Sequence, residues 1–274
     1  MEVHYAALLG AIQGLTEFLP ISSSGHLVFF QDLFGLREPE ILFDIWLHVG
    51  TLVAVCMFFF RDLSKIFTTL FSISTWSSGN HRLVERIWRK PEMKLLSLVL
   101  IGTIPTILIG LVIRPVAAKV FSSVQIVGTM LLVTGLLLWL TRGLRKEGRD
   151  ATQLTVRDAV CIGMVQGMAV LPGISRSGAT IAVGLFMGVD RETAARYSFL
   201  LSIPAILSAL AFEWSQISAS HVPSGGLILL GASIAGTVGY MALKVLMHVV
   251  RRGDLFAFAP YCWLVGTLAI VRSL

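Results

Sequence analysis

Four residues have side chains suited to acid–base and phosphate chemistry, and all four stand in apolar stretches. They are Glu17, Ser23, His26 and Arg176. A carboxylate or an imidazole can serve as a general acid, a general base or a nucleophile, and an activated serine can attack phosphorus. A guanidinium binds phosphate through its planar fork. Since charged groups in membrane segments are costly, they indicate a functional site, here one that hydrolyses a phosphoanhydride or a phosphoester.

Hydroxyl groups surround the arginine in the sequence. They belong to Ser175, Ser177 and Thr180. Because a helix is expected to start here, its N-terminal N–H groups would favour an anion at the same place. We therefore predict that these three residues bind phosphate together with Arg176.

Gln13 lies four residues before Glu17, so the two side chains share one face of a helix. Their oxygens could hold a hard divalent cation, Mg²⁺ or Ca²⁺, which would help to neutralise phosphate charge. The sequence thus predicts a divalent cation at Gln13 and Glu17 as the cofactor.

These polar residues also have structural interpretations. Glu17 and Arg176 could form a buried ion pair that only stabilises the fold, and His26 could cap a helix or pack. Asp44 could face lipid headgroups, and His48, one turn deeper, could support a neighbouring site residue. Neither Asp44 nor His48 is assigned to the site.

The two polar segments are copies of one another. Residues 13–25 read QGLTEFLPISSSG, and residues 166–178 read QGMAVLPGISRSG, aligned without a gap. The initial glutamine occurs in both, so a structural role for Gln13 is as plausible as a role in the site. The copies differ where Glu17 and Arg176 stand. Each copy is therefore expected to supply half of one site.

The composition predicts an all-α polytopic membrane protein. The chain of 274 residues is 55% hydrophobic and only 14% charged, which leaves too little polar surface for a soluble protein. Its net charge of +6 is typical of basic cytoplasmic loops. We expect no nucleic-acid partner, because no basic segment is interleaved with aromatic residues. The N-terminus lacks a basic region and a cleavage site, so no signal peptide is expected.

Six segments are apolar and long enough, or nearly so, to span a bilayer. They are residues 43–60, 95–113, 122–141, 195–213, 226–248 and 255–271. Two further apolar stretches, 4–36 and 156–189, are each broken by proline and a run of small polar residues. Proline stops a helix and serine can cap the next one, so each stretch predicts two short helices. Neither arm can cross alone, which favours re-entrant helical hairpins.

Three spans separate the hairpins, so the second half should be inverted relative to the first. The predicted units are a first repeat at 1–141, a cytoplasmic linker at 142–155 and an inverted second repeat at 156–274. Each repeat has one re-entrant hairpin and three transmembrane helices, and together they form one membrane domain. Such inverted repeats place a site at the interface between them.

The orientation follows from the distribution of the 22 lysine and arginine residues. If the first hairpin opens to the outside, most of them fall in cytoplasmic loops, as the positive-inside rule requires. Both termini and the opening of the site would then lie on the periplasmic or extracellular side.

The motifs at residues 13–26 and 172–180 resemble those of the bacterial undecaprenyl-pyrophosphate phosphatases, also called bacitracin-resistance proteins. The resemblance covers essentially the whole chain in length, span order and duplication. It implies an enzyme of the bacterial inner (plasma) membrane that uses a divalent cation to hydrolyse undecaprenyl pyrophosphate to undecaprenyl phosphate and inorganic phosphate. The product is the lipid carrier for cell-wall synthesis, and the activity confers bacitracin resistance.

The resemblance further implies that Glu17, Ser23, His26 and Arg176 are active-site residues. One departure is Gln13, where many members carry glutamate. Glutamine cannot act as a base and is a weaker metal ligand, so the acid–base role should fall on Glu17 and the metal affinity should be lower. The nucleophile stays open between His26, Ser23 and a water molecule.

A second class of function fits the same plan. A lipid-phosphate flippase or secondary transporter would also have inverted repeats with broken helices. The differences between the two polar segments argue against transport alone, because one copy supplies a base and the other supplies an arginine that can bind an anion. The sequence leaves the isoprenoid chain length and the oligomeric state open, and it is compatible with a homodimer.

Overall fold

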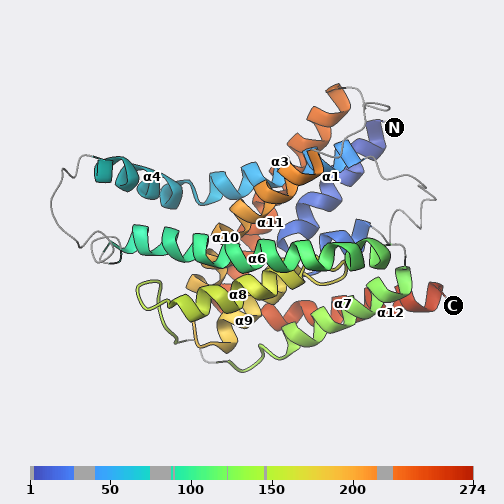
Figure 1. The fold of residues 1–274 in the computed structure, drawn as a ribbon. Coiled ribbons are helices and arrows are strands. Elements are labelled where there is room, and N and C mark those ends of the chain that lie inside the picture. Colours follow the sequence, from blue (N-terminus) through green and yellow to red (C-terminus); the bar gives the residue numbers. More distant parts are fainter. Residues whose placement is uncertain are drawn as a thin grey trace.

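The computed structural model describes residues 3–27, 41–74, 88, 90–121, 123–144, 147–214 and 225–273. Within these residues the regular structure is helical, apart from one isolated bridge between Arg149 and Val189. The helices form an elongated bundle in which the start of the first helix and the end of the last lie at the same end (Figure 1).

The helices agree closely with the predicted segments. They are α1 (Val3–Phe18), α3 (Ile41–Phe58), α4 (Phe60–Ser74), α6 (Pro91–Phe121), α7 (Val124–Trp139), α8 (Val156–Met168), α9 (Arg176–Phe186), α10 (Arg191–Trp214), α11 (Gly225–Arg252), the 3₁₀ turn η1 (Leu255–Phe258) and α12 (Ala259–Arg272). Each predicted span corresponds to one of them. Helix α4 lies between the predicted spans 43–60 and 95–113, in a region where no span was predicted.

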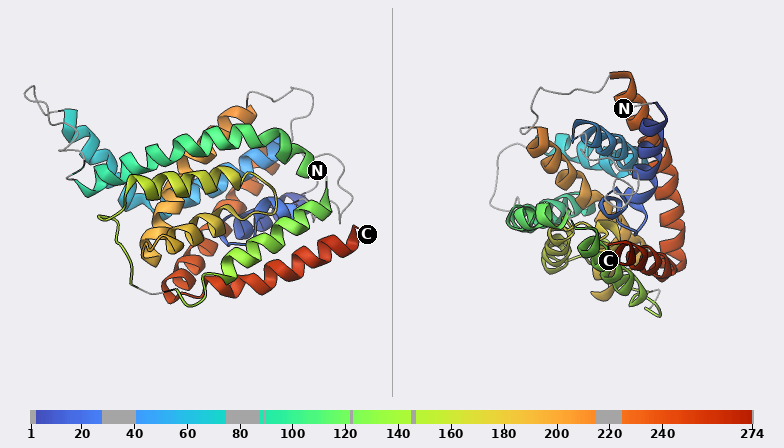
Figure 2. Two further views of the ribbon diagram at one scale, coloured as in Figure 1. Left: turned by 60° about the horizontal axis from the view of Figure 1, so that its bottom comes forward. Right: turned by 90° about the vertical axis from the view of Figure 1, so that its right-hand side faces the viewer.

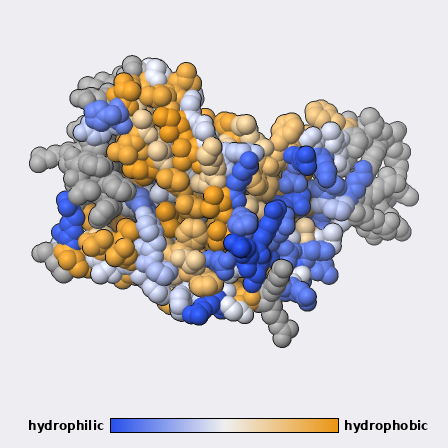
Figure 3. All heavy atoms as spheres, turned by 180° about the vertical axis from the view of Figure 1, so that it is seen from behind, coloured by the Kyte–Doolittle hydropathy of each residue, from blue (hydrophilic) through white to orange (hydrophobic). Residues whose placement is uncertain are grey.

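The architecture is that of a polytopic membrane protein. Four helices among the described residues are long and apolar enough to cross a bilayer, and α3 with α4 forms a further candidate, bent by 75°. Apolar side chains cover much of the face seen in Figure 3, and hydrophilic ones gather toward the end of the bundle where α4 lies. This distribution suits a protein whose middle contacts lipid and whose ends contact water.

Helices from the two halves of the sequence pack against one another. Helix α11 packs against both α1 and α3, α6 packs against α8, and α7 packs against α12 (Figure 2). Small residues allow these approaches, as is usual between membrane helices. A Cβ atom at Gly50 would lie 2.2 Å from the Ala232 carbonyl oxygen, and one at Gly163 would lie 2.1 Å from that of Gly102.

The tips of the two broken stretches meet inside the bundle. After α1 the chain turns at Pro20, and Ser22 has a φ of 68°, which is rare for a residue with a side chain. After α8 the turn uses Gly173, with a φ of 94°. A Cβ atom at Gly25 would lie 3.3 Å from Gly173 Cα, so the tips are in direct contact.

Equivalent serines cap the helix after each break. Ser22 Oγ accepts a hydrogen bond from the Gly25 N–H at 3.3 Å, and Ser175 Oγ accepts one from the Gly178 N–H at 3.1 Å. These bonds satisfy N–H groups that have no partner within the helix. The repeated serine in the sequence thus has a structural role in both copies.

An ion pair attaches the linker to the second half. Arg149 donates two hydrogen bonds of 2.6 Å to the carboxylate of Asp158, which is only 1% exposed. Asp158 also accepts a hydrogen bond from the Thr155 backbone N–H and completes a capping box at the start of α8. One buried carboxylate therefore joins the linker to the start of α8.

Replacing Asp158 by alanine should reduce the free energy of unfolding by about 3 kcal/mol, because it removes a helix cap and leaves a guanidinium without its partner. Thermal unfolding of the purified protein in detergent measures this change. The matched control is Glu147→Ala, which removes an exposed carboxylate from the same linker. Equal losses in the two variants would contradict the assignment.

Candidate active site

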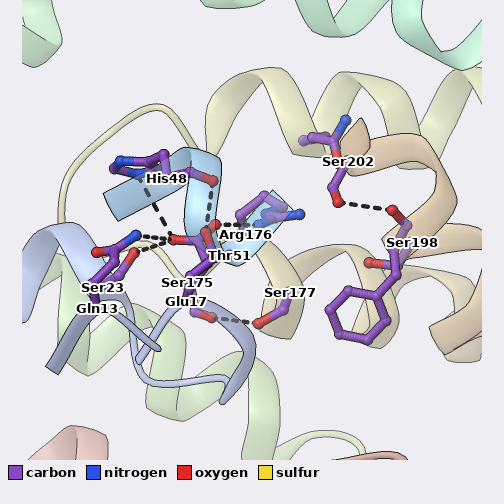
Figure 4. A network of polar contacts seen from close by, with 12 residues as sticks. Gln13, Glu17, Ser23, His48, Thr51, Ser175, Arg176, Ser177, Ser198 and Ser202 are labelled. Carbon is purple, nitrogen blue, oxygen red and sulfur yellow. Dashed lines mark hydrogen bonds and ion pairs between the residues drawn. The ribbon is translucent and has the colours of Figure 1, made fainter. Parts of the chain in front are cut away.

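The carboxylate of Glu17 is the centre of a buried polar network (Figure 4). The side chain of Arg176 forms an ion pair with Glu17 Oε1. Ser23 Oγ donates a hydrogen bond of 2.8 Å to Glu17 Oε2, and Gln13 Nε2 donates one of 3.0 Å to the same oxygen. Four predicted site residues are thereby brought together from both copies of the repeat.

Local structure explains how these side chains converge. Gln13 and Glu17 lie on one face of the last turns of α1, and Ser23 begins the helical turn after the break. Arg176 is the first residue of α9. Helix α7 holds the second tip in place, because Thr134 Oγ1 donates to the Gly173 carbonyl at 2.8 Å and accepts from the Ser175 N–H at 3.1 Å.

The network lies in the wall of a cavity of about 660 Å³. Polar wall residues come mainly from the two tips and α3: Glu17, Ser22, Ser23, Ser24, His48, Ser175 and Arg176. The wall then follows α6 and α10 and becomes mostly apolar: Ile107, Leu111, Ala205, Ile206, Ala209 and Leu210. The cavity thus combines a charged region with an apolar arm.

His48 joins the network, although the sequence analysis left it unassigned. Its Nε2 lies 3.9 Å from Glu17 Oε2, and its side chain is 34% exposed. Its Nδ1 lies 2.9 Å from the Asp44 carbonyl oxygen. A carbonyl only accepts hydrogen bonds, so Nδ1 carries the proton and the other nitrogen faces Glu17. An ionisable residue within an apolar span was the signal that pointed to it.

His26 occupies a different place from the one that the sequence suggested. It is 2% exposed and is not among the residues that line the cavity. Its Nδ1 lies 2.8 Å from the Ser22 carbonyl oxygen, and its Nε2 lies 2.7 Å from the Tyr261 hydroxyl. The two rings also stack, with centroids 5.6 Å apart. His26 thus lies behind the serine-rich tip and joins it to α12.

Only one of the three predicted phosphate-binding hydroxyls lies at the cavity. Ser175 lines the cavity beside Arg176, whereas Ser177 and Thr180 are buried and are not among the lining residues. Ser177 Oγ lies 3.2 Å from Ser175 Oγ, and Thr180 Oγ1 donates to the Arg176 carbonyl at 2.7 Å. Ser177 and Thr180 therefore support the tip from behind.

Several buried polar atoms at this site lack a partner. In the part of the chain that the structure describes, four buried side-chain atoms have no hydrogen-bond partner. One is Gln13 Oε1, one is Arg176 Nη1 and one is Gln166 Oε1, which belongs to another cavity-lining residue. Unpaired buried groups are costly. Their concentration here indicates a site that binds a polar ligand.

The protein offers few ligands for a metal ion. Among the described residues no group of three or more histidine, cysteine, aspartate or glutamate side chains could hold one. The unpaired Gln13 Oε1 and the Glu17 carboxylate are the oxygens at this site that could hold a cation, although it is Gln13 Nε2 that faces Glu17. Two such oxygens suit Mg²⁺, which usually takes its other ligands from water and substrate phosphates.

Comparison with known proteins gives a consistent result over the full length. The family model described as "Bacitracin resistance protein BacA" matches residues 6–268. An undecaprenyl-diphosphatase of Desulfatibacillum aliphaticivorans is 50% identical over 97% of both chains. Those of Desulforapulum autotrophicum and Halothermothrix orenii are 45% and 41% identical, each over 100% of this chain and 99% of the relative. The chain therefore belongs to the BacA family of bacitracin resistance proteins.

Proposed function

We propose that this protein is an integral membrane phosphatase that hydrolyses undecaprenyl pyrophosphate to undecaprenyl phosphate and inorganic phosphate. The observation that carries the proposal is the Glu17–Arg176 pair, joined by Ser23, in the wall of a cavity with an apolar arm. A charged pyrophosphate head fits the first part and an isoprenoid chain fits the second. The named activity of the relatives agrees with this chemistry.

The ion pair is the resting state of the site in this proposal. Arg176 Nη2 is held by Glu17, whereas its Nη1 is buried without a partner. A pyrophosphate that enters competes with the carboxylate for the guanidinium, which matches phosphate with parallel N–H donors. As Arg176 turns to phosphate, Glu17 loses the neighbouring positive charge and becomes a stronger base. Substrate binding thus activates the base.

The same geometry favours Ser23 as the nucleophile. Its hydroxyl already donates to Glu17 Oε2, so the proton has an acceptor when Oγ attacks the terminal phosphorus. The bridging P–O bond breaks, and undecaprenyl phosphate leaves with its electron pair. Water then hydrolyses the phosphoserine. His26 is less suited to attack, because both of its ring nitrogens are engaged away from the cavity.

Electrostatic stabilisation supplies most of the expected rate. The charge that develops on the equatorial phosphate oxygens would face Arg176 and the N-terminus of α9, whose dipole favours an anion. Gln13 Oε1 and Glu17 would hold Mg²⁺ or Ca²⁺, which would neutralise phosphate charge when bound. Glutamine at position 13 makes this site weaker than a pair of carboxylates would.

The same proposal includes the inverted arrangement. The repeats at 1–141 and 156–274 would each contribute one re-entrant hairpin, and the cavity and both termini would face the outside of the plasma membrane. Support comes from the shortness of α8 and α9, with 13 and 11 residues, and from the contact between the two tips. A helix needs roughly 20 residues to span the bilayer.

Phosphate release from a polyprenyl pyrophosphate tests the function. The purified protein in detergent should release phosphate, and a chelator should suppress the release. Failure to release phosphate, together with movement of the lipid across liposomes that contain the protein, would instead favour the flippase.

Replacing Tyr261 by phenylalanine tests the role of His26. If His26 positions the tip that carries Ser23, loss of the Tyr261 hydroxyl should lower kcat by roughly tenfold, the value of one buried hydrogen bond. A nucleophilic histidine would instead tolerate Tyr261→Phe and lose all activity in His26→Asn. The control is Tyr240→Phe, which alters an aromatic residue that packs against Phe58 on another part of the bundle.

A further inference from the structure

A second arginine lines the same cavity. It lies on α6, away from the network around Glu17. Arg114 lies in a candidate membrane span that runs from Pro91 to Ala117. The cavity wall follows this helix from Thr106 through Ile107 and Leu111 to Arg114. Arg114 lies three residues before the end of this span, where an arginine side chain can reach the membrane interface.

The bonding of Arg114 differs from that of the arginines that form ion pairs in this protein. Other arginines with acidic partners form the pairs Arg149–Asp158, Arg176–Glu17, Arg196–Asp62 and Arg251–Glu192. Arg114 makes no hydrogen bond or ion pair with the residues that the structure describes. Its guanidinium carbon instead lies 3.5 Å from the centroid of the Phe212 ring on α10.

The stacking leaves the arginine ready to bind an anion. A ring beneath the guanidinium fixes its plane by a cation–π contact. The five N–H donors point outward from the edge of that plane, so the ring contact does not occupy them. Phe212, like Arg114, lines the cavity that contains Glu17 and Arg176. One continuous space therefore joins two guanidinium groups, with apolar wall between them.

We propose that Arg114, held by Phe212, is a capture site for the phosphate groups of a lipid at the entrance to the cavity. The site binds the pyrophosphate head first, and the head then moves along the cavity to Arg176. The apolar wall between the two arginines accommodates the first isoprene units once the head has moved. The inference rests on the proposed function, because it assumes that a lipid pyrophosphate is the ligand.

A capture site has a characteristic kinetic signature. It raises the rate of productive encounter, and where encounter limits kcat/KM its loss should raise KM and leave kcat unchanged. The attraction between Arg114 and the pyrophosphate is electrostatic and partly exposed to solvent. It should therefore weaken as salt is added.

The test compares Arg114→Gln with the parent, using farnesyl pyrophosphate in a detergent without phospholipid. We expect KM to rise roughly tenfold, the effect of one charge-assisted contact, with kcat within about twofold of the parent. The dependence of kcat/KM on ionic strength should become shallower. Phe212→Leu should raise KM by a smaller factor, because the arginine remains but loses its support.

The matched control is Arg142→Gln. Arg142 also lies over an aromatic ring, 4.9 Å from that of Trp139, but it does not line the cavity. Its replacement should leave KM and the salt dependence unchanged. Thermal unfolding of each variant confirms that the fold is intact, and Arg114→Lys should give an intermediate KM because it keeps the charge without the planar fork.

The association rate of farnesyl pyrophosphate, measured by stopped flow, separates this inference from the proposed function. A parent that releases phosphate, with an Arg114→Gln variant of unchanged KM and association rate, would overturn the capture site alone. An effect that appears only after phosphatidylglycerol is added would also overturn it, since Arg114 would then bind ordinary lipid headgroups. A parent that binds the probe without releasing phosphate would overturn the function, whereas roughly tenfold slower association with Arg114→Gln would still support capture.

Discussion

Glu17→Gln is expected to lower kcat by roughly 10³-fold while KM stays the same or falls. Glutamine keeps the shape of the side chain but cannot accept the proton that Ser23 donates to Glu17 Oε2. It also releases Arg176 from its ion pair and removes a negative charge from beside the phosphates. Substrate binding should therefore not weaken. Initial rates of phosphate release over a range of substrate concentrations give both constants.

The control for this variant is Glu192→Gln, which alters an exposed carboxylate paired with Arg251. It should leave both constants unchanged. A Glu17→Gln variant with a strongly raised KM and a normal kcat would contradict the role of Glu17 as the base and would assign it to binding.

Arg176→Lys is expected to lower kcat/KM by roughly 10²- to 10³-fold, although the charge is kept. The guanidinium matches phosphate with parallel N–H donors, whereas an ammonium is a point charge without that fork. Arg196→Lys is the control, because it alters another arginine–carboxylate pair, with Asp62, that does not line the cavity. Full activity in Arg176→Lys would contradict the phosphate role.

The double variant Glu17→Gln with Arg176→Lys should lose less activity than the product of the two single losses. The two residues act as one unit in the resting pair and in the activation of the base, and such units are not additive. A strictly multiplicative loss would show that they act independently.

The helices were largely predictable because hydropathy alone identifies apolar spans. The breaks near Pro20 and Gly173 were also predictable, because proline and glycine interrupt a helix for local reasons. Helix α4 was missed, because its apolar and polar residues share a short amphipathic helix that reads as a polar loop. Hydropathy averages over both faces of such a helix.

The site was predictable only where local spacing determines it. Gln13 and Glu17 share a helical face, and the duplication indicated that Arg176 would lie opposite. The direction of the turn after the first break depends on Ser22, whose φ of 68° no residue preference predicts. His26 contacts Tyr261 and is not among the residues that line the cavity. His48 joins the network through tertiary packing, which single-sequence spacing does not contain.

The separation of the ion-pair partners along the chain has a consequence for synthesis. Glu17 and Arg176 are 159 residues apart, so the carboxylate leaves the ribosome long before the guanidinium does. Until then its burial would place an uncompensated charge in an apolar surrounding, which is strongly unfavourable. We expect the first tip to stay near water or protonated during insertion and to pack only after the second half has been made. The buried Glu17–Arg176 pair would then form only in a chain whose second half has been synthesised.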